Sequence, residues 1–521
     1  MKVGFIGGPA RCEPSEKRYG PSPPSDCMLK TSTRNLKKTS LANATSYAEW
    51  ASAAQNLDET SGRANWRAQE ADSRFDYRRI RKRLDGLRSA RRSENPRDVL
   101  FALNEGIHGN LGGIANPRLY NHCLFGTKHL IEEYIEEVTL ALDYLAGVSE
   151  AEIPYEERLD FFRRASHCYG RSALMLSGAG SRTPYHFGVV RALHEEGLLP
   201  NIISGSSGGA IVAGMAGSVA PAELSEKLSS EALVAMHQAV TPPDNGVDLL
   251  HRPIRHEKLV ELVDHFIPDL TFEEAYEVSG LHINISVASD QAYQKSRLLN
   301  AITTPHVYLR EAVRASCSVP GVFPSVMLAS QDHNGHRKPY LPELKWIDGS
   351  ITDDLPARRL GRLYGVNHFI ASQTNPAVLW GLRDLTQTSP PVKIALGWAN
   401  DIWKANLRAT RPIAHTMAKR IKGVGSLNHI LYSVALQQYT ADINILPSQR
   451  LIDPRKVLSH ISLEDSMALY EDGQRVTWPK IEMVRNTTMI SRRLDDILDQ
   501  YEHATDTQRF RYKKSTTGAD R

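Results

Sequence analysis

Residues 201–219, NIISGSSGGAIVAGMAGSV, constrain the fold of this chain more than any other stretch. The apolar pair Ile202-Ile203 leads into a run of glycine and serine, and small apolar residues at helical spacing follow. This order predicts a strand, a tight turn and a helix, the context in which a G-x-S-x-G string carries chemical meaning. Gly205 and Gly209 permit a sharp turn with a crowded backbone.

Ser207 stands in the middle of this turn and is a candidate nucleophile. Its hydroxyl would project from the turn, with the positive end of the following helix behind it. The alternative is a plain loop that joins two elements, because so short a string also occurs by chance. The rest of the chain must decide between the two interpretations.

The composition limits the classes of protein that fit. The 521 residues include 63 basic and 59 acidic side chains, and this near balance does not indicate a nucleic-acid partner. The five cysteines are scattered and lack CxxC spacing, which argues against a disulfide framework or a zinc site and suits a reducing compartment. We therefore expect no metal and no cofactor.

The hydropathy pattern bears on membranes. No uninterrupted apolar run approaches the roughly 20 residues that cross a bilayer, and the first residues lack the apolar core of a secretory signal. We expect a cytoplasmic protein that, where it meets membranes, lies on their surface.

Five segments are expected along the chain. We interpret residues 1–43 as a mobile tail, 44–168 as a helical domain, 169–375 as an α/β hydrolase core, 376–505 as a helical region and 506–521 as a polar tail. In the third segment, predicted strands alternate with predicted helices. This alternation predicts a three-layer α/β/α core with a mostly parallel sheet.

The expected elements of that core follow from short apolar runs and helical periodicity. Strands are predicted at residues 173–176, 281–287, 346–347 and 368–371, and helices at 187–196 and 307–317. Outside the core, long helices are predicted at residues 127–146 and 483–501.

Two basic amphipathic stretches are candidates for contact with anionic lipid. The first, residues 74–92, carries Arg78, Arg79, Arg81, Lys82, Arg88, Arg91 and Arg92. The second, residues 392–423, combines Trp398 and Trp403 with several lysines and arginines, and Pro412 predicts a kink or two helices. The alternatives are a solvated face with acidic partners for the first and an ordinary docked helix for the second.

A serine hydrolase also needs hydrogen-bond donors for the oxyanion. Gly178-Ala179-Gly180 directly follows the predicted strand 173–176, and such small residues let backbone N–H groups turn toward a substrate carbonyl oxygen. Arg182 adds positive charge nearby. A plain turn between a strand and a helix is the alternative.

The candidate base is an aspartate, because His368 and His415 lack a suggestive setting. Asp348-Gly349 follows an apolar strand end in KWIDGS. A carboxylate with a pKa of about 3.9 is a weak base, and partial burial would raise that pKa toward a useful value. The pair Asp-Gly is also a common turn signal.

In this order the three motifs resemble those of the patatin-like phospholipases. SGAGSR, GSSGG and DGS correspond to the family's GGGxR/K, GxSxG and DGG/A. RASCSVPGVFPSVML, DGSITDDLPARRL, NHFIASQTNP and TWPKIEMVRNTT resemble its triacylglycerol-lipase branch. The segment NLGGIANPRLYNHCLFGTKHLIEEYIEEV resembles the helical domain of DUF3336 type that precedes the patatin core in that branch.

The resemblance implies a patatin-like fold and hydrolysis of lipid acyl esters by a Ser–Asp dyad. It implies that Ser207 is the nucleophile and Asp348 the general base. By the same resemblance, the oxyanion loop comprises Gly178, Ala179, Gly180, Ser181 and Arg182, the nucleophile elbow includes Gly205 and Gly209, and the Asp loop includes Gly349 and Ser350. Acyl transfer to a lysolipid and non-catalytic lipid binding are the alternatives.

Some residues depart from the family pattern. Ala179 replaces the middle glycine, Thr183 stands where glycine often follows the basic residue, and Ser350 replaces Gly or Ala. We expect a negative φ at Ala179, and an extended Thr183 because Pro184 follows it.

His460 and Asp465 have the H-x4-D spacing associated with glycerolipid acyltransferases. We interpret this string instead as a helix start, with Ser462 as the cap and Asp465 in the first turn.

Overall fold

The computed structural model describes residues 41–240, 253–291, 294, 296–374, 441–449 and 458–517. Residues 1–40 of the predicted tail, the basic stretch 392–423 and His415 lie outside the described residues.

The region before the sheet is helical, as predicted. Its helices are α2 (Tyr47–Thr60), α3 (Arg63–Ala68), α4 (Tyr77–Arg92), α5 (Pro96–Asn104), α6 (Pro117–Tyr120), α7 (His129–Ala146) and α8 (Tyr155–Tyr169), with a 3-10 turn η1 (Leu111–Gly113). The helix predicted at 127–146 corresponds to α7, which ends at the C-cap Gly147. The apolar stripe of α7 packs in the core that this region shares with the sheet.

The central sheet has seven strands, mostly parallel, as the alternating pattern predicts. They are β1 (Arg171–Leu176), β2 (Ile202–Gly205), β3 (His282–Ser289), β4 (Arg297–Asn300), β7 (Trp346–Asp348), β8 (Val366–Ser372) and β9 (Ile443–Ile445). The order is β4-β3-β2-β1-β8-β9, and β7 also pairs with β3. Pairing is parallel from β3 to β9, whereas β4 and β7 run antiparallel to β3.

Helices cover both faces of the sheet, which confirms the three-layer prediction. Leu174 and Leu176 of β1 pack in the large core with α9 (Thr183–Glu195) and α10 (Gly208–Ala216). Ala173 and Met175 point to the opposite face, toward α17 (Ala357–Tyr364). This alternation is the period of two expected of a strand covered on both sides.

Smaller elements complete the core region. They are α11 (Leu224–Lys227), α12 (Ser230–Val240), α13 (His256–Phe266), α14 (Phe272–Ser279), α15 (Leu309–Ser316), α16 (Ser350–Asp353), the 3-10 turn η2 (Gly180–Arg182) and the hairpin of β5 (Ala329–Gln331) and β6 (Arg337–Pro339). The predicted helix 307–317 corresponds to α15.

The C-terminal region differs from the prediction in two ways. Strand β9 extends the sheet within a segment predicted to be helical, because a three-residue strand leaves no periodic signal of its own. The helix predicted at 483–501 is much longer: α22 runs over Ile481–Thr517, and no Gly or Pro interrupts the chain before Gly518. Residues 506–517, predicted to be part of a polar tail, are therefore helical.

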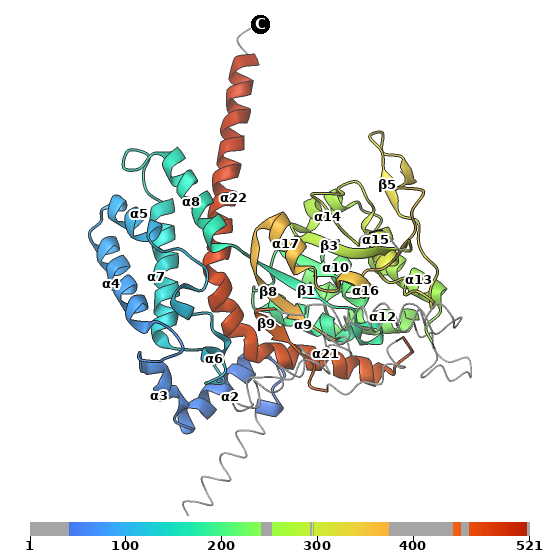
Figure 1. Cartoon of the computed structure of the whole chain (residues 1–521), viewed down its shortest axis with the longest axis horizontal. Coiled ribbons are helices and arrows are strands. Elements are labelled where there is room, and N and C mark those ends of the chain that lie inside the picture. Colours follow the sequence, from blue (N-terminus) through green and yellow to red (C-terminus); the bar gives the residue numbers. More distant parts are fainter. Residues whose placement is uncertain are drawn as a thin grey trace, which may run out of the picture.

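Helix α22 and its neighbour connect the two regions. Figure 1 shows α22 between the N-terminal helices and the sheet, and it contacts α7, α8 and β1. The preceding α21 (Leu463–Thr477), joined to α22 by the 3-10 turn η4 (Trp478–Lys480), packs closely on α9. A Cβ at Gly188 would lie 1.9 Å from the carbonyl oxygen of Tyr470, so only glycine permits this approach.

Three of the seven basic residues predicted on the face of α4 are paired with acidic side chains. Arg81 contacts Glu70, and Arg88 and Arg91 contact Glu133 and Glu137 of α7 at 3.1 and 2.8 Å. These ion pairs favour the alternative of a face with acidic partners over an anionic-lipid patch. Among the described residues, no helix is long and apolar enough to cross a membrane.

Candidate active site

Ser207 occupies a strained turn between β2 and α10. Its φ of 51° and ψ of −122° lie in a region that residues other than glycine rarely adopt. Two hydrogen bonds from residues at the end of α15 hold the backbone of Ser207 in this conformation. The N–H of Ser207 donates to Ser316 Oγ at 3.0 Å, and Cys317 Sγ donates to the carbonyl oxygen of Ser207 at 3.3 Å.

The glycines on both sides of Ser207 allow the backbone to pass close to its neighbours. A Cβ at Gly205 would lie 2.4 Å from the carbonyl oxygen of Gly209, and a Cβ at Gly209 would lie 2.4 Å from that of Leu176. Both distances are well below 3.0 Å, so a Cβ atom at either position would overlap with the carbonyl oxygen. The predicted elbow geometry is therefore present, and any larger residue at either position would open it.

Asp348 lies at the end of β7, buried at 2% exposure. Its N–H donates to the carbonyl oxygen of Ser318 at 3.0 Å, and its Oδ1 accepts the N–H of Ser350 at 2.8 Å. The side chain of Ser207 lies close enough to this carboxylate to lower the pKa of Asp348. The structure thus brings together the two residues of the predicted dyad, although their catalytic roles remain predictions.

The environment of Asp348 favours a basic carboxylate. Burial raises its pKa to about 6, while the hydrogen bonds from Ser350 and Ser207 act in the opposite direction. Gly349 lies against β3, where a Cβ would be 2.2 Å from the carbonyl oxygen of Ser286. Ser350 begins α16 and supplies its N–H to the carboxylate.

The raised pKa predicts an acidic limit to activity. A general base must be ionised, so kcat/KM should be constant above about pH 7 and fall about tenfold per pH unit below pH 6. A pH profile with a soluble ester, whose own ionisation does not intervene, checks this. If kcat/KM instead begins to fall only near pH 4, the pKa range of an ordinary aspartate, the assignment of Asp348 as the base would be contradicted.

The predicted oxyanion loop follows β1 and passes beside the elbow. Ala179 is buried with a φ of −127°, so the alanine fits without strain, and Gly180 has a positive φ of 54°. A Cβ at Gly208 would lie 3.1 Å from the backbone nitrogen of Gly180, so these two residues are in close contact. The N–H groups of Gly180 and Gly208 are therefore our candidates for oxyanion donors.

Other members of this loop have different surroundings. The N–H of Gly178 donates to Asp354 Oδ1 at 2.7 Å, so it is already committed within the protein. Ser181 and Arg182 lie in η2, and burial lowers the pKa of the Arg182 guanidinium.

The expectation for Thr183 is wrong. Its φ of −46° and ψ of −39° are helical, and it is the first residue of α9. Pro184 lies in the first turn, where a missing N–H costs nothing. The hydroxyl of Thr183 donates to the carbonyl oxygen of Gly180 at 2.7 Å, which compensates for the disfavoured conformation before proline.

Asp354 is a site residue that the sequence did not reveal. It is 1% exposed; its carboxylate accepts the N–H of Gly178, and its carbonyl oxygen accepts the hydroxyl of Ser206 at 3.0 Å. It therefore ties the Asp loop to both the oxyanion loop and the elbow. The string DDLP six residues after Asp348 carries no signal of this role, because its partners are distant in sequence.

Two histidines lie in settings other than that of a catalytic base. His186 is buried beneath the oxyanion loop, 2.7 Å from Ser372 Oγ and 3.0 Å from the carbonyl oxygen of Ser177, and burial lowers its pKa to about 3. It is therefore neutral and supports the loop. His368 lies near the amino end of β8, whereas Ser207 follows the carboxyl end of β2.

The H-x4-D string is a helix start, as expected. Ser462 is the N-cap of α21, and its Oγ accepts the N–H of Asp465 at 3.0 Å. This removes the local motif that favoured an acyltransferase. Among the described residues, no group of three or more His, Cys, Asp or Glu side chains could hold a metal ion.

The class of protein follows from this geometry and from comparison with known proteins. A serine on a strained strand-to-helix turn, beside a buried aspartate in an α/β core, is the architecture of a serine hydrolase. A family model described as patatin-like phospholipase matches residues 174–360, and one described as a domain of unknown function (DUF3336) matches residues 28–167.

Relatives of known name match most of the chain. Triacylglycerol lipase ptl3 of Schizosaccharomyces pombe is 31% identical, with 87% of this chain and 95% of that protein covered. Triacylglycerol lipase 4 of Saccharomyces cerevisiae is 34% identical, with 85% of this chain but only 51% of that protein covered. The chain thus spans about half the length of the second relative. It belongs to the patatin-like phospholipase family.

A solved structure gives a weaker match. The crystal structure of VipD from Legionella pneumophila is 12% identical, with a TM-score of 0.27 and 64% of this chain and 68% of that chain covered. A likeness at this level carries no argument about the present chain.

Proposed function

We propose that this chain is a lipid acyl-ester hydrolase that works through a Ser207–Asp348 dyad. The observation that carries the proposal is the position of Ser207, on a strained turn, beside a buried carboxylate whose pKa is raised to about 6. Such a carboxylate is ionised near neutral pH and still basic enough to accept a proton in the transition state.

The reaction proceeds in two halves. Ser207 Oγ attacks the ester carbonyl carbon while its proton passes to Asp348, and the N–H groups of Gly180 and Gly208 stabilise the oxyanion. The C–O bond then breaks, and the proton moves from Asp348 to the leaving alcohol. Asp348 next takes a proton from water while the water oxygen attacks the carbonyl carbon of the acyl-enzyme. The bond between Ser207 Oγ and the acyl carbon then breaks, Asp348 returns the proton to Ser207 Oγ, and the fatty acid leaves.

The substrate we propose is an acylglycerol at a membrane or lipid-droplet surface. Named relatives are triacylglycerol lipases, which supports this class of substrate. Val322 and Met327 are 48% and 46% exposed. They lie in the loop that follows Ser318, whose carbonyl oxygen holds the N–H of Asp348. Exposed apolar side chains in a loop that also contacts Asp348 suit contact with lipid.

A panel of substrates tests the proposal. Wild type should release fatty acid from emulsified triacylglycerol faster than from phospholipid liposomes, and Ser207→Ala should release none above background. Val322→Ser with Met327→Ser should lower the emulsion rate about tenfold and leave hydrolysis of soluble p-nitrophenyl butyrate unchanged.

Leu140→Ser, which changes an exposed apolar residue of α7, is the matched control and should affect neither substrate. If no acyl lipid is hydrolysed above the Ser207→Ala background, the proposed activity is wrong. If the double variant matches wild type on emulsions, the lipid surface lies elsewhere.

A further inference from the structure

A cavity of about 500 Å³ lies at the seam between the helical region and the sheet. It touches Ser172 near the start of β1, whereas the oxyanion loop follows the end of the same strand. At about 3.3 Å per residue, the cavity is about 20 Å from the dyad along β1. It is therefore separate from the candidate active site.

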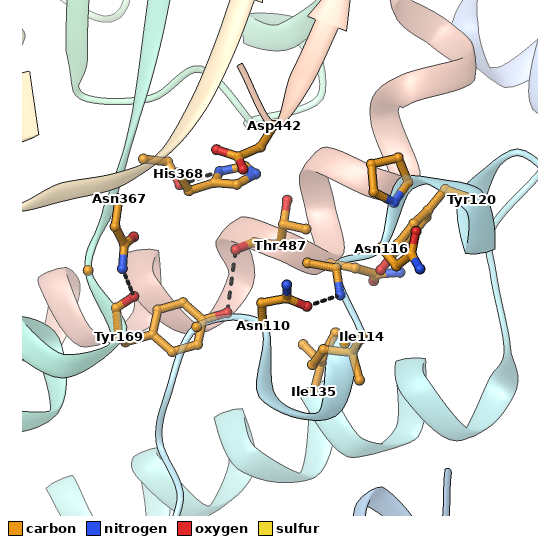
Figure 2. A pocket seen from close by; sticks show the side chains of 17 residues that line it. Asn110, Ile114, Asn116, Tyr120, Ile135, Tyr169, Asn367, His368, Asp442 and Thr487 are labelled. Carbon is orange, nitrogen blue, oxygen red and sulfur yellow. Dashed lines mark hydrogen bonds between the residues drawn. The ribbon is translucent and has the colours of Figure 1, made fainter. Parts of the chain in front are cut away.

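Three parts of the chain build this cavity. The helical region contributes the loop from Gly109 to Pro117, Tyr120 of α6, Ile135 of α7 and Tyr169 of α8. The sheet contributes Ser172, Asn367 and His368, joined by Asp442 near β9, and α22 contributes Asn486 and Thr487. Figure 2 shows His368 and Asp442 across from Asn110, Ile114 and Ile135.

Much of the lining is held rigidly by internal hydrogen bonds. Asn110 Oδ1 accepts the N–H of Ala115 at 2.9 Å, which fixes the loop. Asn367 Nδ2 donates to the carbonyl oxygen of Tyr169 at 2.8 Å, which connects β8 with the end of α8. The walls are thus formed before any ligand enters (Figure 2).

Three buried polar atoms of this lining have no hydrogen-bond partner among the residues that the structure describes: Tyr120 Oη, His368 Nε2 and Asn486 Nδ2. Tyr120 and Asn486 lie near each other, but neither atom reaches hydrogen-bond geometry with the other. The other ring nitrogen of His368, Nδ1, forms a hydrogen bond with Ser172 Oγ at 3.0 Å. Each unmet group costs about 1–3 kcal/mol unless something in the cavity satisfies it.

The charge of the lining selects the chemistry of a ligand. None of the described residues that line the cavity is a lysine or an arginine, and burial lowers the pKa of His368 against the opposite effect of Asp442. Asp442 contributes the one carboxyl group among these residues. An anion such as a phosphate or a fatty carboxylate would therefore meet no compensating charge.

Hydroxyl groups fit the unmet atoms better than other polar groups, because a hydroxyl both donates and accepts. The Asn486 amide nitrogen needs an acceptor, and Tyr120 Oη can use a donor or an acceptor. The Asp442 carboxyl group already accepts the N–H of Phe369 at 2.8 Å and has room to accept further donors. Between these points, Ile114, Ile135 and the ring of Tyr169 offer apolar surface for C–H groups. We propose that this cavity binds a small uncharged polyol or sugar-like molecule at the seam between the helical region and the α/β core.

Saturation-transfer NMR titrations on the full chain test the site with glycerol, myo-inositol and glucose as probes and inorganic phosphate as the anionic comparison. At least one polyol should bind saturably with a Kd below about 50 mM, and phosphate should not. Tyr120→Phe should weaken this binding about tenfold, because it removes one hydrogen bond.

Tyr120→Phe is expected to fold normally, because the hydroxyl that it removes has no hydrogen-bond partner in the described part of the chain. The melting temperature of this variant without ligand should therefore not fall. Tyr134→Phe, in a buried tyrosine outside the lining, is the matched control and should bind as wild type. Ser207→Ala should also bind as wild type.

Three results would overturn the proposal. The first is no saturable binding of any of the three polyols, which would leave the cavity a site for water alone. The second is equal affinity in wild type and Tyr120→Phe. The third is an unexpected specificity of binding. Loss of binding in Ser207→Ala would place the ligand in the candidate active site, and preferential binding of phosphate would change the class of ligand.

Discussion

Ser207→Ala is expected to lower kcat for ester hydrolysis by about 10⁴-fold or more, and Asp348→Asn by a similar factor. The alanine removes the atom that forms the acyl-enzyme. The asparagine keeps the shape of Asp348 and its bond from Ser350, but it cannot accept the proton. Steady-state kinetics on a soluble ester, with melting temperatures to show that each variant folds, measure the effect.

Ser206→Ala is the matched control for this pair. Ser206 is the neighbour of the nucleophile and is also buried, but its hydroxyl donates to the carbonyl oxygen of Asp354 rather than to Asp348. Its loss should cost less than about tenfold in kcat, as expected for one neutral hydrogen bond. A folded Ser207→Ala or Asp348→Asn protein with more than a tenth of wild-type activity would refute the dyad.

Asp354→Ala is expected to lower kcat about 100-fold with little change in KM. The carboxylate of Asp354 holds the N–H of Gly178 and so fixes the loop that carries the Gly180 donor. A misplaced oxyanion donor costs about as much as a missing one, 10²- to 10³-fold. Asp354→Asn should recover most of the activity, because its amide oxygen can accept the same N–H.

Asp353→Ala provides the comparison for Asp354. Asp353 is the adjacent aspartate and pairs with Arg359 at 3.1 Å, away from Gly178. Its removal should change kcat by less than about tenfold. If both alanine variants lose the same activity, or if Asp354→Asn is as slow as Asp354→Ala, then Asp354 supports the fold but does not position the loop.

Much of the core could be predicted from the sequence because its signals are local. The strand, turn and helix around Ser207 are contiguous, and β1, β3 and β8 are apolar runs near the predicted positions. That Ser207 and Asp348 lie close together could be predicted because the order of three short motifs is specific, whereas their catalytic roles stay predictions. Thr183 was misjudged because the rule for residues before proline yields to a local bond from its own hydroxyl.

The remainder depends on contacts between distant segments. Asp354 acts on Gly178, 176 residues earlier, and no spacing rule connects them. Strand β9 is defined by its pairing with β8 and not by its own three residues. The polar cavity has the same origin, because Tyr120, His368 and Asn486 come from the helical region, the sheet and α22. Such sites become visible only when the chain is folded.

The most direct test of the Ser207–Asp348 dyad is covalent labelling of the folded chain by a fluorophosphonate, followed by peptide mass spectrometry. We predict a single adduct on Ser207 that forms at neutral pH, slows below pH 6 and is strongly reduced in Asp348→Asn. An unlabelled Ser207 in folded wild type, or equal labelling in Asp348→Asn, would contradict the account.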